Sequence, residues 1–438
     1  MSLRFLTGAA SVALLAALAP VSPASAQEAA PAAAPAAPAH PSWNGITFSG
    51  HIEGGTNVNP DSPENNVNQG QLMTDRANSF RVNQVMLTAQ KDIDPASSAF
   101  NWGFKLQGTY GTDARITHFF NEGDLWTNSP YQWDITEANL QAHLPIYFPG
   151  GMDVKIGQYS TPMGYEVIDA TGNFFYTHSY IFNYGLPLKH TGVLTTSHVT
   201  DMIDVYAGFD MGNQASLPTR YGDNNATGAV LGGFGINNPI PNLTILALAH
   251  IGAENGYVKG TPATPGINGH SRQIYDVTST YHVNDQLTVA NEINFTKDDL
   301  FGATAEGTAF YGIYKWSDAW SFGARGEVYR DDQGFFVSSV GGSQDFVRLE
   351  RANLLPTSAV YAAGPATYTE LTLGANWAPA LAFPSALPPS LGLTLRPEFR
   401  WDHAFSVGGN GNAFNMNSSG AFTKNDQFLL SVDAILAF

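Results

Sequence analysis

The stretch DQFLLSVDAILAF, residues 426–438 at the C-terminal end, decides the fold. Apolar side chains occupy every second position from Phe428 to Phe438, and Asp433 lies in the opposite phase. Successive side chains of a β-strand point to opposite faces, so one face of this strand is apolar along its whole length. The alternative is an edge strand of a soluble sandwich, but its long apolar edge would invite aggregation.

The same alternation recurs upstream, in segments about as long as the ~9 to 11 residues that a tilted membrane strand needs. The final aromatic residue resembles the signal by which outer-membrane barrels are recognised for assembly. We therefore predict an all-β, transmembrane antiparallel β-barrel of about 16 strands. The segments are 46–57, 79–93, 100–111, 135–146, 151–160, 188–199, 202–212, 227–237, 243–254, 272–284, 286–297, 307–317, 320–330, 368–379, 391–403 and 426–438.

The connections between these segments alternate between short and long, as they do in bacterial barrels with tight periplasmic turns, long external loops and an even strand number. Both termini are then expected on the periplasmic side. The Pro-rich connection 379–390 is longer than the other short ones. The predicted long connections are 58–78, 112–134, 161–187, 213–226, 255–271, 298–306, 331–367 and 404–425.

The N-terminus predicts export. Arg4 precedes an apolar run over 9–19 and a small-residue site at 24–26, which is the order of a secretory signal peptide. We therefore expect a signal peptide over 1–26, an Ala- and Pro-rich linker over 27–45, and the barrel over 46–438. The expected location is the outer membrane of a Gram-negative bacterium. The chain contains no cysteine, so disulfides do not stabilise it.

The composition and motifs exclude several functions. A formal net charge of -17 argues against nucleic acid as a partner. The sequence lacks G-x-S-x-G, H-E-x-x-H and phosphate-loop motifs, and His143, His190 and His198 stand isolated on their strands. A catalytic set assembled from several strands remains a minor alternative. We expect no enzyme activity, no cofactor and no metal site.

The alternation also predicts which charged residues face the lumen. A barrel of this strand number is too wide for side chains to fill, so the default interior is an aqueous pore. The inward charges either set an ion preference through transverse fields or pair with one another across the lumen. The predicted pore-lining residues are Lys105, Glu137, Lys155, Arg325, Glu327, Arg396, Glu398 and Arg400.

The third long connection, residues 161–187, is unusually aromatic for a segment that should face water. One interpretation is that it folds into the barrel and narrows it, which makes Tyr165, Glu166, Asp169 and Tyr180 constriction-loop candidates. The other is a contact between protomers or a lid packed on itself.

One part of the sequence, residues 110–194, resembles a known family. The resemblance rests on YGTDARITHF (110–119), ITEANLQAHLP (135–145), VKIGQYSTPMGYEVIDA (154–170) and IFNYGLPLKHTGVL (181–194), and FSGHIEGG (48–55) looks like the first strand of that family. These motifs are similar to those of the OmpL-like β-barrel porin family of outer-membrane proteins. The resemblance implies an outer-membrane barrel with a porin role and assigns no substrate.

Two functions follow as expectations. The first is a porin that lets small hydrophilic solutes or ions diffuse through a water-filled barrel. The alternative is an adhesive or structural outer-membrane barrel whose lumen is closed by loops. The expected partners are outer-membrane lipid and lipopolysaccharide, the barrel assembly machinery, and further copies of the chain in a homotrimer.

Overall fold

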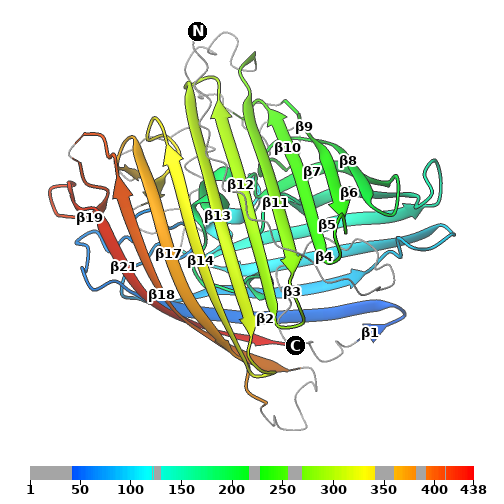
Figure 1. The fold of residues 1–438 in the computed structure, drawn as a ribbon, viewed down its shortest axis with the longest axis horizontal. Helices are drawn as coiled ribbons and strands as arrows, with labels where there is room; N and C mark the ends of the chain where they lie inside the picture. Colours follow the sequence, from blue (N-terminus) through cyan, green and yellow to red (C-terminus); the bar gives the residue numbers. More distant parts are fainter. Residues whose placement is uncertain are drawn as a thin grey trace.

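The computed structural model describes residues 42–120, 122, 130–216, 227–254, 269–340, 360–380, 391–409 and 411–438. Sixteen antiparallel strands close into a barrel (Figure 1), so the predicted fold and strand number are confirmed. The barrel strands are β2 (Ile46–Val58), β3 (Phe80–Lys91), β4 (Asn101–Gly111), β5 (Gln132–Leu144), β6 (Met152–Ser160), β7 (Lys189–His198), β8 (Ile203–Asp210), β9 (Ala229–Asn237), β10 (Leu243–Gly252), β11 (Arg272–His282), β12 (Leu287–Asp298), β13 (Ala303–Lys315), β14 (Trp320–Asp331), β17 (Ala366–Trp377), β18 (Gly392–Phe405) and β21 (Asp426–Ala437).

The barrel closes between its first and last long strands, β2 and β21. Ile52 lies opposite Leu436. The Gly50 amide donates to Phe438 O at 3.1 Å, and the Phe438 amide donates to Gly50 O at 2.9 Å. A side chain at position 50 would collide with the Phe438 ring, so the absence of a Cβ permits this close approach. The terminal residues of the chain therefore form part of the closing seam.

The described residues also contain smaller elements that are not among the sixteen barrel strands. They are β1 (Ser42–Trp43), which pairs with β2, the hairpins β15 (Ser338–Val340) with β16 (Val360–Ala362) and β19 (Phe414–Met416) with β20 (Phe422–Lys424), and three short helices. The helices are α1 (Ala114–Thr117), η1 (Ala170–Gly172) and η2 (Ile181–Gly185). Among the described residues, none of the helices is long and apolar enough to cross a membrane. The predicted signal peptide and residues 27–41 of the linker lie outside the described residues, whereas Ser42 and Trp43 already belong to β1.

One predicted connection is wrong. The long external loop expected over 298–306 is a tight turn between Asp298 and Ala303, with Gly302 at a φ of 60°. β13 starts earlier than predicted because Ala303 and Ala305 pair with β12 and point inward. Alanine is too small to mark one face of a strand as apolar, so the alternation did not reveal the start of β13. Most of the unusual 379–390 connection lies outside the described residues.

The two faces of the wall follow the predicted alternation. On β21, Phe428 and Leu430 are exposed on the outer face, whereas Leu429 and Asp433 are buried on the inner face. On β10, Leu246 and Leu248 lie in one phase and Ile245 and Ala247 in the other, so alternation does not assign its faces. His250 is fully buried and defines the inward phase. Trp320 and Trp377 stack with their ring centroids 5.8 Å apart beside the short turns, where an interfacial aromatic girdle belongs.

Asn291 is a polar residue at an outward position of β12, where the alternation places apolar side chains such as Val289 and Ile293. Its side-chain amide donates to Ala309 O at 2.9 Å and to Thr308 Oγ1 at 3.2 Å on β13. These bonds satisfy the amide within the wall, which removes most of the penalty of placing it toward lipid.

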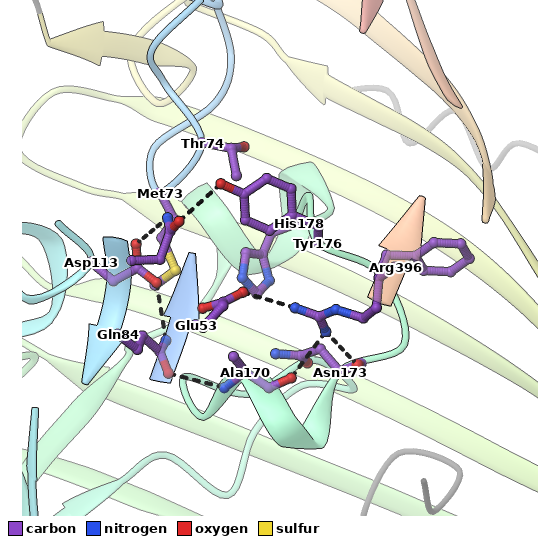
Figure 2. Close-up of a pocket in the computed structure, with 12 residues that line it drawn as sticks. Glu53, Met73, Thr74, Gln84, Asp113, Ala170, Asn173, Tyr176, His178 and Arg396 are labelled. Atoms are coloured by element: carbon purple, nitrogen blue, oxygen red, sulfur yellow. Dashed lines mark hydrogen bonds and ion pairs between the residues drawn. The ribbon is translucent and has the colours of Figure 1, made fainter. Parts of the chain in front are cut away.

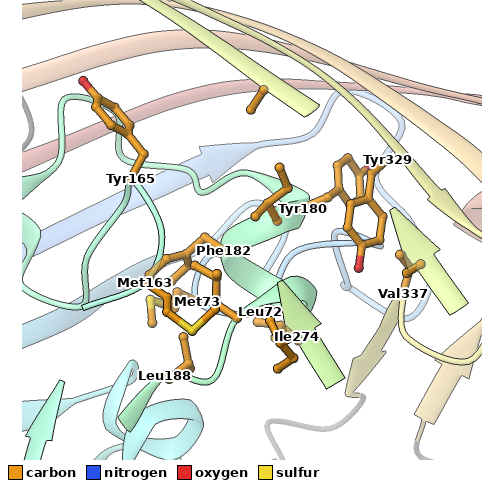
Figure 3. Packing of buried hydrophobic residues seen from close by; sticks show 14 of the residues in the cluster. Leu72, Met73, Met163, Tyr165, Tyr180, Phe182, Leu188, Ile274, Tyr329 and Val337 are labelled. Carbon is orange, nitrogen blue, oxygen red and sulfur yellow. The ribbon is translucent and has the colours of Figure 1, made fainter. Parts of the chain in front are cut away.

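The lumen contains an apolar core made largely by connections that fold inward. Tyr165, Tyr180 and Phe182 come from residues 161–188 between β6 and β7, which we call the lumen segment, and Leu72 comes from the connection 59–79 (Figure 3). They pack against inward-facing side chains such as Tyr329 of β14. The sequence predicted a water-filled interior, whereas the structure fills a large part of it with packed side chains.

The face assignment generates a test. Leu430 lies near the middle of β21 and is 52% exposed on the outer face. We expect Leu430→Arg to destabilise the barrel in bilayers by about 2–4 kcal/mol, because the charge would face hydrocarbon. Denaturant unfolding in vesicles measures this effect. Ser418→Arg, on an exposed loop, should change stability by less than about 0.5 kcal/mol, and equal effects of the two changes would contradict the assignment.

Candidate functional site: the lumen segment and its wall

The predicted pore-lining residues divide into two groups on different parts of the inner wall. Lys105, Glu137 and Lys155 lie on β4, β5 and β6, at the back of the barrel in Figure 1. The others lie on β14 and β18 and are almost completely buried: they are Arg325, Glu327, Arg396, Glu398 and Arg400. The lumen segment covers this second group.

Carboxylates of the wall accept hydrogen bonds from the backbone of the lumen segment. Glu398 accepts from the amides of Tyr176 and Thr177 at 2.8 and 3.2 Å. Glu327 accepts from the amide of Tyr180 and from the one after it, at 2.6 and 2.8 Å. A buried N–H group without a partner is unfavourable, so each carboxylate satisfies two groups that an irregular segment cannot satisfy by itself.

Arginines of the wall provide the complementary donors. Each guanidinium donates to at least one backbone carbonyl of the lumen segment, and such charge-assisted bonds are stronger than neutral ones. The bonds run from Arg325 Nη1 to Thr177 O at 2.7 Å, from Arg396 Nη1 to Asn173 O at 2.8 Å, and from Arg400 Nη1 to His178 O at 2.6 Å.

The same arginines form buried ion pairs. Arg325 contacts Glu370 and Glu166 at 2.7 Å each. The guanidinium of Arg396 lies 2.8 Å from Glu53 and also pairs with Asp433, and that of Arg400 lies 2.7 Å from Asp402. Sequence analysis did not select Glu53 or Asp402 as site residues. Alternation alone could have found Asp402, two positions after Arg400 on the same face, whereas Glu53 reaches Arg396 only because the barrel closes.

The constriction-loop candidates all lie in the lumen segment and contact the wall. The Tyr165 ring lies 4.2 Å from that of Tyr311 on β13, centroid to centroid. The Tyr180 hydroxyl donates to Asp402 at 2.9 Å, and burial raises the pKa of Tyr180, so the hydroxyl keeps its proton. The structure thus places the segment against the inner wall of its own barrel and not on the outer face, where a contact between protomers would lie.

Glu166 and Asp169 have different environments. Glu166 is buried between Arg325 and His178, at 2.7 and 2.9 Å. Burial raises the pKa of this carboxyl, but Arg325 and His178 lower it by more than burial raises it, so the pKa of Glu166 is about 2. Asp169 caps η1 through the Thr171 amide, accepts from Gln107 at 3.1 Å and is partly exposed.

A small cavity remains where the lumen segment meets β2, β3 and β18 (Figure 2). Glu53, Asp113, Tyr176 and Arg396 are among its lining residues, and its volume is about 10 Å³. That is room for about one water molecule. Solutes therefore cannot pass between the lumen segment and this part of the wall.

The wall formed by β4 to β6 is less covered. The side chain of Lys105 is 31% exposed and lies 3.7 Å from Glu137, and inward-facing Gln141 and Lys155 are partly exposed as well. Several inward side chains of this wall are therefore accessible to solvent.

The first three external loops carry several carboxylates that would attract cations to the mouth of the barrel, but at least two of them form ion pairs in the described residues. Asp75 pairs with Arg115 at 2.6 Å, and Asp61 pairs with Lys424. Asp124 lies outside the described residues. Loop carboxylates therefore give weaker support for cation attraction than their number in the sequence suggested.

Comparisons with known proteins agree with this architecture. A family described as "Putative beta-barrel porin-2, OmpL-like" matches residues 45–438. No curated relative matches the chain by sequence.

Solved structures of similar fold include the outer-membrane channel DcaP of Acinetobacter baumannii, with 11% identity over 90% of this chain and 97% of that one, at a TM-score of 0.50. OprB of Pseudomonas putida has 15% identity over 90% and 94%, at 0.51. An anion-selective porin from Comamonas acidovorans has 10% identity over 90% and 99%, at 0.50. At these identities the likeness concerns the barrel fold alone.

The anchoring of the lumen segment can be tested at Arg325. We expect Arg325→Ala to destabilise the protein by about 3–5 kcal/mol, because it leaves Glu166 and Glu370 buried without their cation. Thermal unfolding gives the stability, and hydrogen exchange should show faster exchange in residues 161–188. Arg330→Ala on the same strand removes a partly exposed arginine paired with Asp332 and should change stability by less than about 0.5 kcal/mol.

A second test uses pH. The pKa of Glu166 is about 2, below the ordinary value of 4.5, so its charge stabilises the docked segment above about pH 4.5. That stabilisation is lost as the pH falls toward 2. We expect the difference in unfolding temperature between the wild type and Glu166→Gln to be largest near pH 7 and to shrink below pH 4.5. A difference that stays constant down to pH 2.5 would contradict the role of the Glu166 charge.

Proposed function

The chain belongs to the OmpL-like β-barrel porin family, and from this premise we propose that small hydrophilic solutes or ions diffuse through its lumen along the wall of β4 to β6. One observation carries the proposal. The lumen segment is fixed against β14 and β18, whereas inward side chains on β4 to β6 remain partly exposed. The segment acts as a constriction and limits passage to small solutes.

The pore-lining assignment is narrower than the one expected from sequence. Lys105 and Lys155 are the proposed lining residues in contact with solutes, and Glu137, which is buried in the wall, contacts Lys105 at 3.7 Å. Arg325, Glu327, Arg396, Glu398 and Arg400 act indirectly, because they hold the constriction in place. Since the three arginines are neutralised in ion pairs, the proposed ion preference is weak and depends on the two lysines.

The alternative function is an adhesive or structural barrel with a closed lumen. The observation that favours it is the extent of packing inside the barrel, including the cavity of only about 10 Å³ between the segment and β2, β3 and β18. Neither function requires catalysis or a cofactor.

The proposed partners are those of an outer-membrane protein. After export through its signal peptide, the barrel is inserted by the assembly machinery and contacts lipid and lipopolysaccharide. A homotrimer is the proposed assembly. A groove of about 530 Å³ lies on the wall of β11 to β14, where Gly312 and Gly326 carry no side chain and Asn291 carries a small one. This groove supports a contact between protomers on that face.

Planar-bilayer recording tests the function. The refolded wild type should give stable ohmic steps, and replacing residues 166–183 by a short Gly-Ser linker should increase the conductance. Lys155→Glu should shift the reversal potential in a salt gradient toward cation preference. Lys315→Glu, on the exposed rim, is the matched control and should leave the reversal potential unchanged.

The two proposed functions predict different outcomes. If a folded, heat-modifiable wild-type barrel gives no steps while the shortened variant conducts, the lumen is closed in the native protein and the alternative function holds. If Lys155→Glu and Lys315→Glu shift the reversal potential equally, the path does not follow β4 to β6.

A further inference from the structure

Three strands bring His190, Asp210 and His250 together on the inner wall, near the external ends of β7, β8 and β10. All three side chains are fully buried. His190 Nδ1 lies 3.3 Å from Asp210 Oδ2, and His250 Nε2 lies 3.1 Å from Asp210 Oδ1. One nitrogen or oxygen atom from each residue lies within 4.8 Å of the other two.

The sheet builds this cluster through a small residue on the intervening strand. Asp210 pairs with Ala229 on β9, and Ala229 pairs with Gly252 on β10. Ala229 is buried and fills little space. His250, two positions before Gly252, can therefore reach the Asp210 carboxylate across β9.

The cluster contains buried polar atoms without hydrogen-bond partners. These are Nδ1 of His250, together with Nδ1 of His190 and Oδ2 of Asp210, which lie 3.3 Å apart without the geometry of a hydrogen bond. Such atoms are uncommon in native proteins and point to a strained, functional or ion-binding site. Their number within one cluster distinguishes it from ordinary polar packing of the wall.

A second histidine cluster in the same barrel provides a contrast. Near the short-turn end, His198 bonds to Asp204 at 2.7 Å through Nδ1 and to Asp153 at 3.1 Å through Nε2. His143 bonds to Asp153 at 2.6 Å and to Ser97 O at 2.9 Å. Both ring nitrogens of each histidine are satisfied there, so that cluster is explained by hydrogen bonding alone.

We propose that His190, Asp210 and His250 bind one divalent transition-metal ion of the Zn²⁺, Co²⁺ or Ni²⁺ class. Imidazole nitrogen with carboxylate oxygen suits these ions. Bonds of about 2.0–2.2 Å in a tetrahedral site place neighbouring ligand atoms roughly 3.3–3.5 Å apart. The two histidine nitrogens lie 3.1 and 3.3 Å from the two oxygens of Asp210, close to this spacing. Because the three ligand atoms lie within 4.8 Å of one another, the two histidine nitrogens need to approach each other by at most about 1.5 Å.

The surroundings have the features of an outer coordination sphere. His190 Nε2 lies 3.0 Å from Thr161 Oγ1, a contact that orients the ring with Nδ1 toward Asp210. Glu254 Oε1 lies on the far side of the His250 ring, 3.9 Å from Nδ1. Hydroxyl and carboxylate groups behind metal-bound histidines fix the rings and raise their affinity. A water molecule would complete a four-coordinate site.

The three ligands lie apart from the proposed pore, although Thr161 behind His190 is the first residue of the lumen segment. The ligands lie on β7, β8 and β10, whereas the proposed path follows β4 to β6 and the anchors of the lumen segment lie on β14 and β18. A bound ion would join three strands of the wall close to the external loops.

Metal binding by the full-length, tag-free protein tests the proposal. After treatment with a chelator, the refolded wild type is dialysed against CoCl₂ and then measured for metal content and visible absorption. We expect one Co²⁺ per chain, with a d–d band typical of tetrahedral nitrogen and oxygen ligands, and displacement of Co²⁺ by ZnCl₂. A folded barrel that retains no stoichiometric Co²⁺ would overturn the site.

Asp210→Asn and His250→Gln should weaken Co²⁺ binding at least about 100-fold, since each removes a ligand. His198→Gln, which changes a histidine of the satisfied cluster, is the matched control and should bind like the wild type. Heat modifiability and far-UV circular dichroism report folding of each variant. Unchanged Co²⁺ binding in the two ligand variants would show that the ion binds elsewhere and would also overturn the site.

If the ligand variants do not fold, Co²⁺ binding by Thr161→Val still tests the site. It removes the hydroxyl behind His190 and leaves all three ligands in place. We expect it to weaken Co²⁺ binding roughly 10- to 100-fold. Affinity equal to that of the wild type would contradict the proposed arrangement of ligands.

Discussion

A chain segment that leaves water must find a partner for every peptide group, and the interior of this barrel is organised by that requirement. The lumen segment has only short helical turns of its own. Glu327 and Glu398 accept its N–H groups, and Arg325, Arg396 and Arg400 donate to its carbonyls. Without these bonds, the desolvation of the backbone would outweigh the apolar contacts that the segment gains.

This requirement changes the meaning of the charges on the inner wall. Opposed charges inside a wide barrel suggest a transverse field that acts on passing ions. Here each of the three wall arginines forms an ion pair with a wall carboxylate and also donates to the backbone of the lumen segment. Arg325, for example, bonds to Glu370 and to Thr177 O. The wall of β4 to β6, where Lys105 stays partly exposed, is left for solvent. The cluster of His190, Asp210 and His250 lies on another region of the wall, formed by β7, β8 and β10.

The alternation of apolar residues predicted the strands of the barrel correctly, but it failed to mark the strand end where the side chains are small. All sixteen strands were found because each has enough apolar residues in one phase. The connection between β12 and β13 was predicted to be too long because Ala303 and Ala305 carry no such signal, although they are fully paired with β12. The inward phase of β10 was ambiguous because Leu246 and Leu248 lie on the inner face with His250, where the lumen segment and other connections supply an apolar core.

By itself, the sequence determined the fold class, the strands, the two faces of the wall outside β10, and the aromatic character of the lumen segment. Each of these depends on neighbouring residues, since alternation is local and lipid selects the same face in every strand. The partners within the lumen were decided by the tertiary structure alone. Tyr180 meets Asp402 across 222 residues of sequence, and Glu53 meets Arg396 across 343. Closure of the barrel sets these pairs, and no local pattern records which inward residues then lie opposite one another.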